Sequence, residues 1–168
     1  MYCVAGSQMS DAPSPQPTGA LVTEEVRRRI GMESRPRTVT VTAEHIAAYA
    51  QAVMWPNPPD PLFSDLHAAA RGRHKGVIAS PTFGTGMRDG QDEVMDLPLP
   101  PHRAALLKRM EFIARAPIRP GDAITWVSRL ADVVERGHRV ELVVDRDFHN
   151  QRGELVLTVR STLVRLYR

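Results

Sequence analysis

The chain has 168 residues, the usual size of one domain, and 42% of them are hydrophobic, enough for one core. Its net charge is +3, and aromatic residues (5%) interleave with no basic run, so we expect no nucleic-acid partner. No apolar run approaches the ~18 residues that a membrane helix needs. The single cysteine, Cys3, leaves no intramolecular disulfide or cysteine-based zinc site. We find no secretion signal before Glu24 and therefore expect a cytoplasmic protein.

The first part of the chain divides into a tail and the start of a folded domain. Residues 1–20 are rich in Ser, Pro, Gln and Gly, which predicts a disordered tail, with one domain over residues 21–168. Thr23 is a suitable cap for a short helix that stops at Gly31. Residues Arg37–Thr42 alternate apolar and polar side chains, which predicts a half-buried strand. Thr42 then caps a second helix.

Prolines and glycines punctuate the middle of the chain. The segment Met54–Pro61 contains four prolines, so regular structure is not expected there. Ser64 is predicted to cap a short helix closed by Gly72. Pro81 favours the first turn of a further helix, expected from about Thr82 through Asp89.

The second half predicts four long strands, namely Leu106–Ala116, Asp122–Val134, Arg139–Asn150 and Glu154–Leu166. In the third strand Val140, Leu142, Val144 and Phe148 share one face, while Arg139, Glu141, Asp145 and Asp147 share the other. Gly137 and Gly153 mark two tight hairpin turns. Helices followed by an antiparallel meander indicate an α+β domain.

The segments GVIASPTF, MEFIARAPIRPGDAITW and NQRGELVLTVRSTLV follow the proline loop in an order that resembles the MaoC-like dehydratases of the N-terminal-domain type. The resemblance covers roughly residues 21–166. It implies a hot-dog fold, in which an antiparallel sheet of about five strands wraps around a central helix. Enzymes of that family hydrate or dehydrate acyl thioesters of coenzyme A or acyl carrier protein. Their signature is Asp, any residue, Asn-Pro, one apolar residue and His. The Asp and His of this signature form an acid/base pair that removes a proton from one carbon and gives one to the hydroxyl leaving group.

This sequence departs from that signature. If Asn57-Pro58 is matched to the family's Asn-Pro, Trp55 stands at the aspartate position, and the following SDLHAAA places Phe63 at the histidine position. A gapless match back from Phe63 places Pro58 at the aspartate instead. Either alignment lacks the acid/base pair. In this respect the chain resembles the accessory subunits of heterodimeric (3R)-hydroxyacyl thioester dehydratases, which shape the acyl tunnel while a partner hot-dog chain carries Asp and His.

The resemblance implies a set of substrate-binding residues but no catalytic pair. The expected substrate-binding residues are Trp55, Asn57, Phe63, Ser80, Thr82, Phe83 and Gly84. Asp60 and His67 are the nearest groups that could replace the missing pair, although the simpler interpretation has Asp60 starting a proline turn and His67 facing solvent. The remaining histidines lack ligand spacing, so no metal is expected, and no cofactor is implied.

Three functions stay open at this point. The first is a subunit of an acyl-thioester hydratase or dehydratase, a hydro-lyase of fatty acid or polyketide metabolism, working with a partner chain. The second is a self-sufficient enzyme with a rearranged acid/base pair or thioesterase activity. The third is a non-catalytic acyl-thioester binding protein. In each case the open edge of a hot-dog sheet predicts a homodimer or a heterodimer with a second hot-dog subunit.

Overall fold

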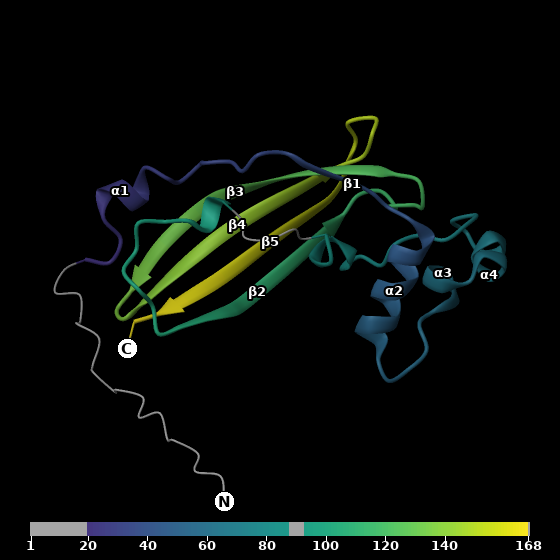
Figure 1. Ribbon diagram of the computed structural model, residues 1–168, viewed down its shortest axis with the longest axis horizontal. Helices are drawn as coiled ribbons and strands as arrows, with labels where there is room; N and C mark the ends of the chain where they lie inside the picture. Colours follow the sequence, from purple (N-terminus) through teal and green to yellow (C-terminus); the bar gives the residue numbers. More distant parts are fainter. Residues whose placement is uncertain (1–19, 88–92, 168) are drawn as a thin grey trace, which may run out of the picture.

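The computed structural model describes residues 20–87 and 93–167 (Figure 1). Five strands form one antiparallel sheet in the order β1-β3-β4-β5-β2. They are β1 (Arg37–Thr40), β2 (Ala104–Ala114), β3 (Ala123–Arg136), β4 (Arg139–His149) and β5 (Leu155–Leu166). All five predicted strands are confirmed, with ends shifted by at most two residues. The predicted tail falls almost entirely on residues 1–19, which lie outside the described residues.

The helices are short, and the longest is the 12-residue α2. They are α1 (Glu24–Arg27), α2 (Ala43–Met54), α3 (Pro61–Ser64), α4 (Leu66–Arg71) and the 3₁₀ turns η1 (Phe83–Thr85) and η2 (Glu93–Met95). Figure 1 shows α2, α3 and α4 gathered at one end of the sheet, with α1 at the opposite end. No helix in residues 20–87 or 93–167 has the length and apolar character needed to span a bilayer.

Two helix boundaries differ from the sequence prediction. The helix α1 ends at Arg27, before Gly31, because the following residues form turns. Asp65 rather than Ser64 caps α4, since its Oδ1 accepts hydrogen bonds from the backbone N–H groups of His67 (2.8 Å) and Ala68 (3.0 Å). These bonds hold the pKa of the Asp65 carboxyl below its ordinary value.

The helix predicted from Thr82 through Asp89 is wrong within the described residues, which form only η1. Gly84 and Gly86 both weaken a helix, and the Thr82 side chain makes no capping hydrogen bond. Residues 88 and 89 lie outside the described residues. The segment nevertheless packs closely on the sheet, because a Cβ built at Gly84 would lie 2.7 Å from Leu157 Cδ2.

The predicted alternation along β4 gives the sheet one apolar and one charged face. Val140, Leu142, Val144 and Phe148 are buried on the inner face. On the outer face, Asp145 accepts hydrogen bonds from Arg160 Nε (2.6 Å) and Nη2 (2.7 Å), and Glu141 accepts from Lys108 Nζ (2.8 Å). The hydrogen bonds from Arg160 lower the pKa of Asp145. Carboxylates therefore neutralise several cations on the outer face.

Candidate functional site

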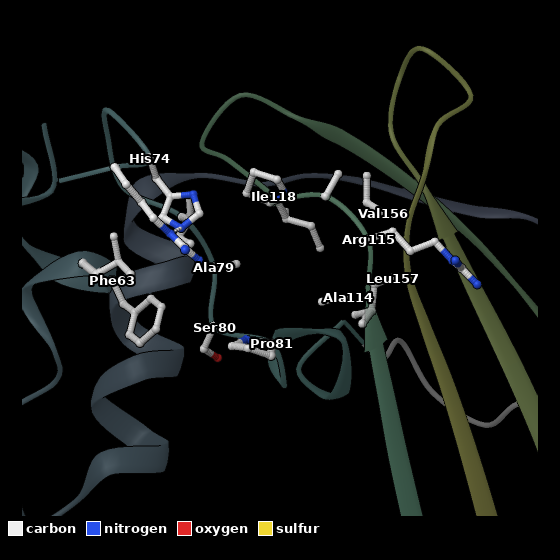
Figure 2. Close-up of a pocket in the computed structure, with 15 residues that line it drawn as sticks. Phe63, His74, Ala79, Ser80, Pro81, Ala114, Arg115, Ile118, Val156 and Leu157 are labelled. Atoms are coloured by element: carbon white, nitrogen blue, oxygen red, sulfur yellow. Dashed lines mark hydrogen bonds between the residues drawn. The ribbon is translucent and has the colours of Figure 1, made fainter.

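A cavity of about 400 Å³ opens where the ends of β2 and β5 meet the α3–α4 region. Four segments far apart in the sequence form its wall: residues 62–63, 73–81, 114–118 and 156–157. Figure 2 shows Phe63, His74 and Ala79 on one side of the space, facing Ala114 and Leu157 on the other. Most of the wall is aliphatic or aromatic, so the cavity suits an apolar ligand.

Backbone hydrogen bonds hold these segments together. The N–H of Ala79 donates to the carbonyl oxygen of Ile118 (2.8 Å), and the N–H of Ile78 donates to that of Leu62 (3.4 Å). The N–H of Arg115 donates to the carbonyl oxygen of Val156 (2.9 Å) and joins the end of β2 to β5. The wall is thus fixed by the main chain of its loops.

The polar side chains in this wall are Arg73, His74, Ser80 and Arg115. Arg73 Nε donates a hydrogen bond to His74 Nε2 (3.1 Å). Arg115 extends away from the cavity in Figure 2. Among the described residues that line the cavity there is no carboxylate. An acid/base pair built on a carboxylate and a histidine is therefore missing from this wall.

Two of the predicted substrate-binding residues, Phe63 and Ser80, meet in this wall. Both are partly buried. Ser80 Oγ lies 3.3 Å from Thr82 Oγ1, and its carbonyl oxygen accepts from the N–H of Phe83 (3.0 Å). The Thr82 carbonyl oxygen accepts from the Tyr49 hydroxyl (2.8 Å). Thr82 therefore supports the turn next to the cavity but does not line it.

Phe83 and Gly84 lie behind the cavity, in the core. Phe83 is 5% exposed and packs edge-on against Tyr49, with ring centroids 5.4 Å apart. It lines a neighbouring cavity of about 380 Å³ between α2 and the sheet, together with Tyr49 and Trp126. Gly84 is buried and contacts Leu157 and Phe148. Both residues are therefore core residues and do not line the 400 Å³ cavity.

The other predicted residues lie outside both cavities. Trp55 ends α2 and is 77% exposed, and Asn57 is exposed beside it. Asp60 caps α3, where its Oδ1 accepts from the N–H of Leu62 (2.8 Å). His67 is exposed on α4. The structure brings neither Asp60 nor His67 into the wall of the 400 Å³ cavity.

Sequence reasoning missed Arg73 and His74 as site residues. The spacing of histidines in the sequence indicates only whether they can share a metal, and it does not detect a side chain that a loop brings to a cavity. The available signal was the run RGRHK, which directly precedes the GVIASP segment. Within residues 20–87 and 93–167, no three His, Cys, Asp or Glu side chains gather as a metal site would require.

A family model described as "FAS1-like, dehydratase domain region" matches residues 28–159. The chain belongs to this family. A UPF0336 protein of Parafrankia sp. (strain EAN1pec) is 31% identical over 132 residues, which cover 74% of this chain and 82% of that protein.

Solved structures identify the fold. The MaoC-like dehydratase from Rhodospirillum rubrum matches with a TM-score of 0.61 and 24% sequence identity. The match covers 83% of this chain and 93% of that protein's chain. A chain of the HadBC (3R-hydroxyacyl-ACP dehydratase) complex from Mycobacterium tuberculosis matches with a TM-score of 0.64 and 22% sequence identity. The match covers 81% of this chain and 96% of that chain. The predicted hot-dog fold is confirmed. In the described residues after Thr82, the 3₁₀ turn η1 stands where the long helix was expected.

Proposed function

We propose that this chain is a hot-dog subunit of an acyl-thioester hydratase or dehydratase that shapes the acyl pocket, while a partner chain supplies the Asp/His pair. The observation that carries the proposal is the cavity wall itself. It is largely apolar, it holds Phe63, and no carboxylate stands among its described lining residues. The sequence alignment predicts that Phe63 takes the family's histidine position. Such a wall can bind an acyl chain, since each buried methylene contributes about 0.8 kcal/mol.

The turn after Pro81 stands where the resemblance to the MaoC-like dehydratases places a helix start. In the family resemblance, free N–H groups at a helix start polarise the thioester carbonyl. Here the N–H of Phe83 donates to Ser80 and the N–H of Thr85 donates to the Thr82 carbonyl oxygen (3.0 Å). Both groups are already engaged in the turn. These two N–H groups are therefore not available to a thioester carbonyl.

The long edge strand β2 is the expected partner surface. Within the described part of the chain, β2 pairs only with β5, so one edge lies open along its length. Leu106, Leu107 and Ile113 on this strand are 55%, 57% and 49% exposed. An open apolar edge promotes aggregation unless another strand pairs with it. Because β2 ends in the cavity wall, a second hot-dog chain paired there would lie beside the acyl pocket.

Turnover with and without a partner tests this function. The assay follows hydration of crotonyl and longer enoyl thioesters by the purified chain, alone and mixed with a hot-dog protein that carries the intact signature. We expect little turnover alone, because each missing acid or base typically contributes ~10²–10⁴-fold, and turnover with the partner. Stable binding without turnover under every pairing would favour a non-catalytic binding protein instead. Light scattering that shows only an 18.7 kDa species would contradict the dimer.

A self-sufficient enzyme, including a thioesterase, is the second candidate, and His74 in the cavity wall is the observation that favours it. If the isolated chain turns over a thioester and the His74→Gln variant does not, the chain is a self-sufficient enzyme and the accessory function is wrong. Cytoplasmic location, the acyl carrier and a role in fatty acid or polyketide metabolism stay predictions.

A further inference from the structure

The end of α2 and the loop after it form an exposed segment without charge. All residues from 51 to 58 are exposed and none of them is charged, in a chain of which 24% is charged. Three of them are large and apolar, since Val53, Met54 and Trp55 are 50%, 41% and 77% exposed. We call these three side chains the apolar tip. A helix end that turns consecutive apolar side chains to solvent is stabilised when another surface covers it.

The apolar tip lies near one end of the edge strand β2. The helix α2 packs against α3, and both Phe63 of α3 and Ala114, the last residue of β2, line the 400 Å³ cavity. Figure 1 shows α2 running away from the sheet on the side of β2. Ile46 of α2 belongs to the same core cluster as Phe148 of the inner face, so α2 lies on the inner side of the sheet. A chain added to the sheet at β2 therefore comes next to the apolar tip.

The opposite end of β2 carries exposed apolar side chains beside a cavity. Leu106 and Leu107, near the start of the strand, are 55% and 57% exposed. Leu107 pairs in register with Leu163, which pairs with the buried Leu142, so Leu107 belongs to the inner face. It lines a cavity of about 360 Å³ together with Met110 and Leu163. Among their described lining residues, this cavity and the 400 Å³ cavity have none in common.

Twofold symmetry brings the two ends of β2 together in a pair of identical chains. A twofold axis perpendicular to the sheet pairs two copies of an edge strand antiparallel, so the end of each β2 lies beside the start of the other. The inner faces of both sheets then lie on the same side. The apolar tip of each copy thus comes next to Leu107 and the 360 Å³ cavity of the other. The cavity is also lined by Arg165, a cation of the kind that the face of an indole ring binds.

We infer that the apolar tip docks on a second copy of this chain, with Trp55 against Leu107 and the lining of the 360 Å³ cavity. In a twofold pair this contact occurs twice, once for the tip of each copy. No charge on the tip has to be desolvated, and tryptophan is among the side chains that most often anchor protein interfaces. The inference rests on the proposed function in one respect, because it uses the same edge strand β2. A catalytic partner chain would take the place of the second copy at this edge.

Sedimentation and fluorescence of the full chain test the contact. The chain has two tryptophans, and Trp126 is only 6% exposed, so quenching by acrylamide reports mainly on Trp55. We expect a species of twice 18.7 kDa to form between about 0.5 and about 100 µM, and Trp55 to become protected from acrylamide over the same concentrations. Trp55→Ala should weaken pairing by about 30-fold or more, the loss expected when a tryptophan anchor is truncated.

A mixing experiment shows whether the contact joins two chains. Trp55→Ala and Leu107→Asp each remove both contacts from a pair of identical variants. A mixed pair keeps one contact, between Trp55 of the Leu107→Asp chain and Leu107 of the Trp55→Ala chain. The equimolar mixture should therefore pair about tenfold more tightly than either variant alone.

Ile30→Asp is the matched control, because Ile30 is a large exposed apolar residue away from β2. It is 38% exposed and lies beside β3, where the N–H of Gly31 donates to the carbonyl oxygen of Leu130 (2.8 Å). This variant should pair as wild type does. Circular dichroism establishes that each variant folds, and the wild-type measurements stand without the variants.

Several results would overturn the inference. They are a wild-type chain that stays monomeric over this range, a pair in which Trp55 is quenched as readily as in the monomer, and a mixture that pairs no better than the single variants. Protection of Trp55 that appears only when a hot-dog protein with the intact signature is added would also overturn it, and would assign the tip to that partner. The proposed function is decided separately, by whether the chain together with such a partner turns over an acyl thioester.

Discussion

Replacing Gly84 by alanine tests how closely the turn after Pro81 packs on the sheet. The added Cβ would lie 2.7 Å from Leu157 Cδ2 and 3.2 Å from Phe148 Cζ, well inside ordinary contact. Leu157 and Phe148 are 2% and 0% exposed, so neither can swing into solvent to make room. Phe148 is further confined by Trp126, whose ring centroid is 6.0 Å away. The methyl group must therefore displace the turn or the core.

The expected loss of stability follows from two opposing effects. Overpacking a close-packed core costs about 1–3 kcal/mol. Restricting the unfolded chain by removing a glycine returns about 0.4–1 kcal/mol. The net free energy of unfolding should fall by about 1–2 kcal/mol. At about 2–4 °C per kcal/mol for a domain of this size, Tm should fall by about 2–8 °C.

Thermal unfolding followed by circular dichroism measures this loss. Gly72→Ala is the matched control, because its Cβ would meet only the Ala69 carbonyl oxygen at 3.4 Å, and its stability should change by less than about 0.5 kcal/mol. In a Leu157→Ala background the Gly84→Ala change should cost less, since the clashing methyl group is gone. A Gly84→Ala protein as stable as wild type, or an equal cost in both backgrounds, would refute the close contact.

Three further predictions concern the pocket and the outer face. With a catalytic partner present, Phe63→Ala should change acyl-length preference more than maximal rate, because it enlarges the cavity without removing a proton-transfer group; equal losses in rate for every acyl length would contradict this. Asp60→Asn and His67→Gln should leave the partnered turnover within about twofold of wild type, as measured by the same hydration assay. The pKa of Asp145 is lowered chiefly by its hydrogen bonds to Arg160, so its stabilising effect is complete above the unfolded pKa of ~3.9 and is lost as pH falls through the folded pKa. Wild-type Tm should therefore fall more steeply below about pH 5 than that of Asp145→Asn, and parallel curves would count against the pairing.

The strands were predictable because their signal is local. Along β4 the side chains alternate between the buried Val140, Leu142 and Val144 and the paired Glu141 and Asp145, a period that only a strand produces. The length of the helix after Pro81 was not predictable in the same way. Proline favours a helix start, but the fold requires Gly84 at the contact with the sheet, and glycine weakens the helix that proline begins.

The site was predictable only in part, because tertiary contacts assemble it. Phe63 and Ser80 were expected from the family resemblance, and both lie in the cavity wall. Arg73 and His74 were not, since their place in the wall depends on the hydrogen bond from Ala79 to Ile118, some 40 residues further along the chain. No spacing rule within a single segment describes a wall made by four segments. The charge of the RGRHK run was visible in the sequence, but the place of Arg73 and His74 in the cavity wall required the structure.

Asp60 illustrates how a residue near the pocket can affect it without transferring a proton. Its Oδ1 accepts from the N–H of Leu62, and its carbonyl oxygen accepts from the N–H of Phe63 (2.9 Å), so Asp60 starts the helix whose first turn places both side chains in the cavity wall. Asparagine caps a helix as well as aspartate, whereas alanine costs ~1 kcal/mol and frees the turn. Asp60→Ala should therefore shift acyl-length preference in the direction of Phe63→Ala, while Asp60→Asn should not. If Asp60→Asn instead abolished turnover by the isolated chain, the carboxylate would be an acid or base, and the accessory-subunit function would be wrong.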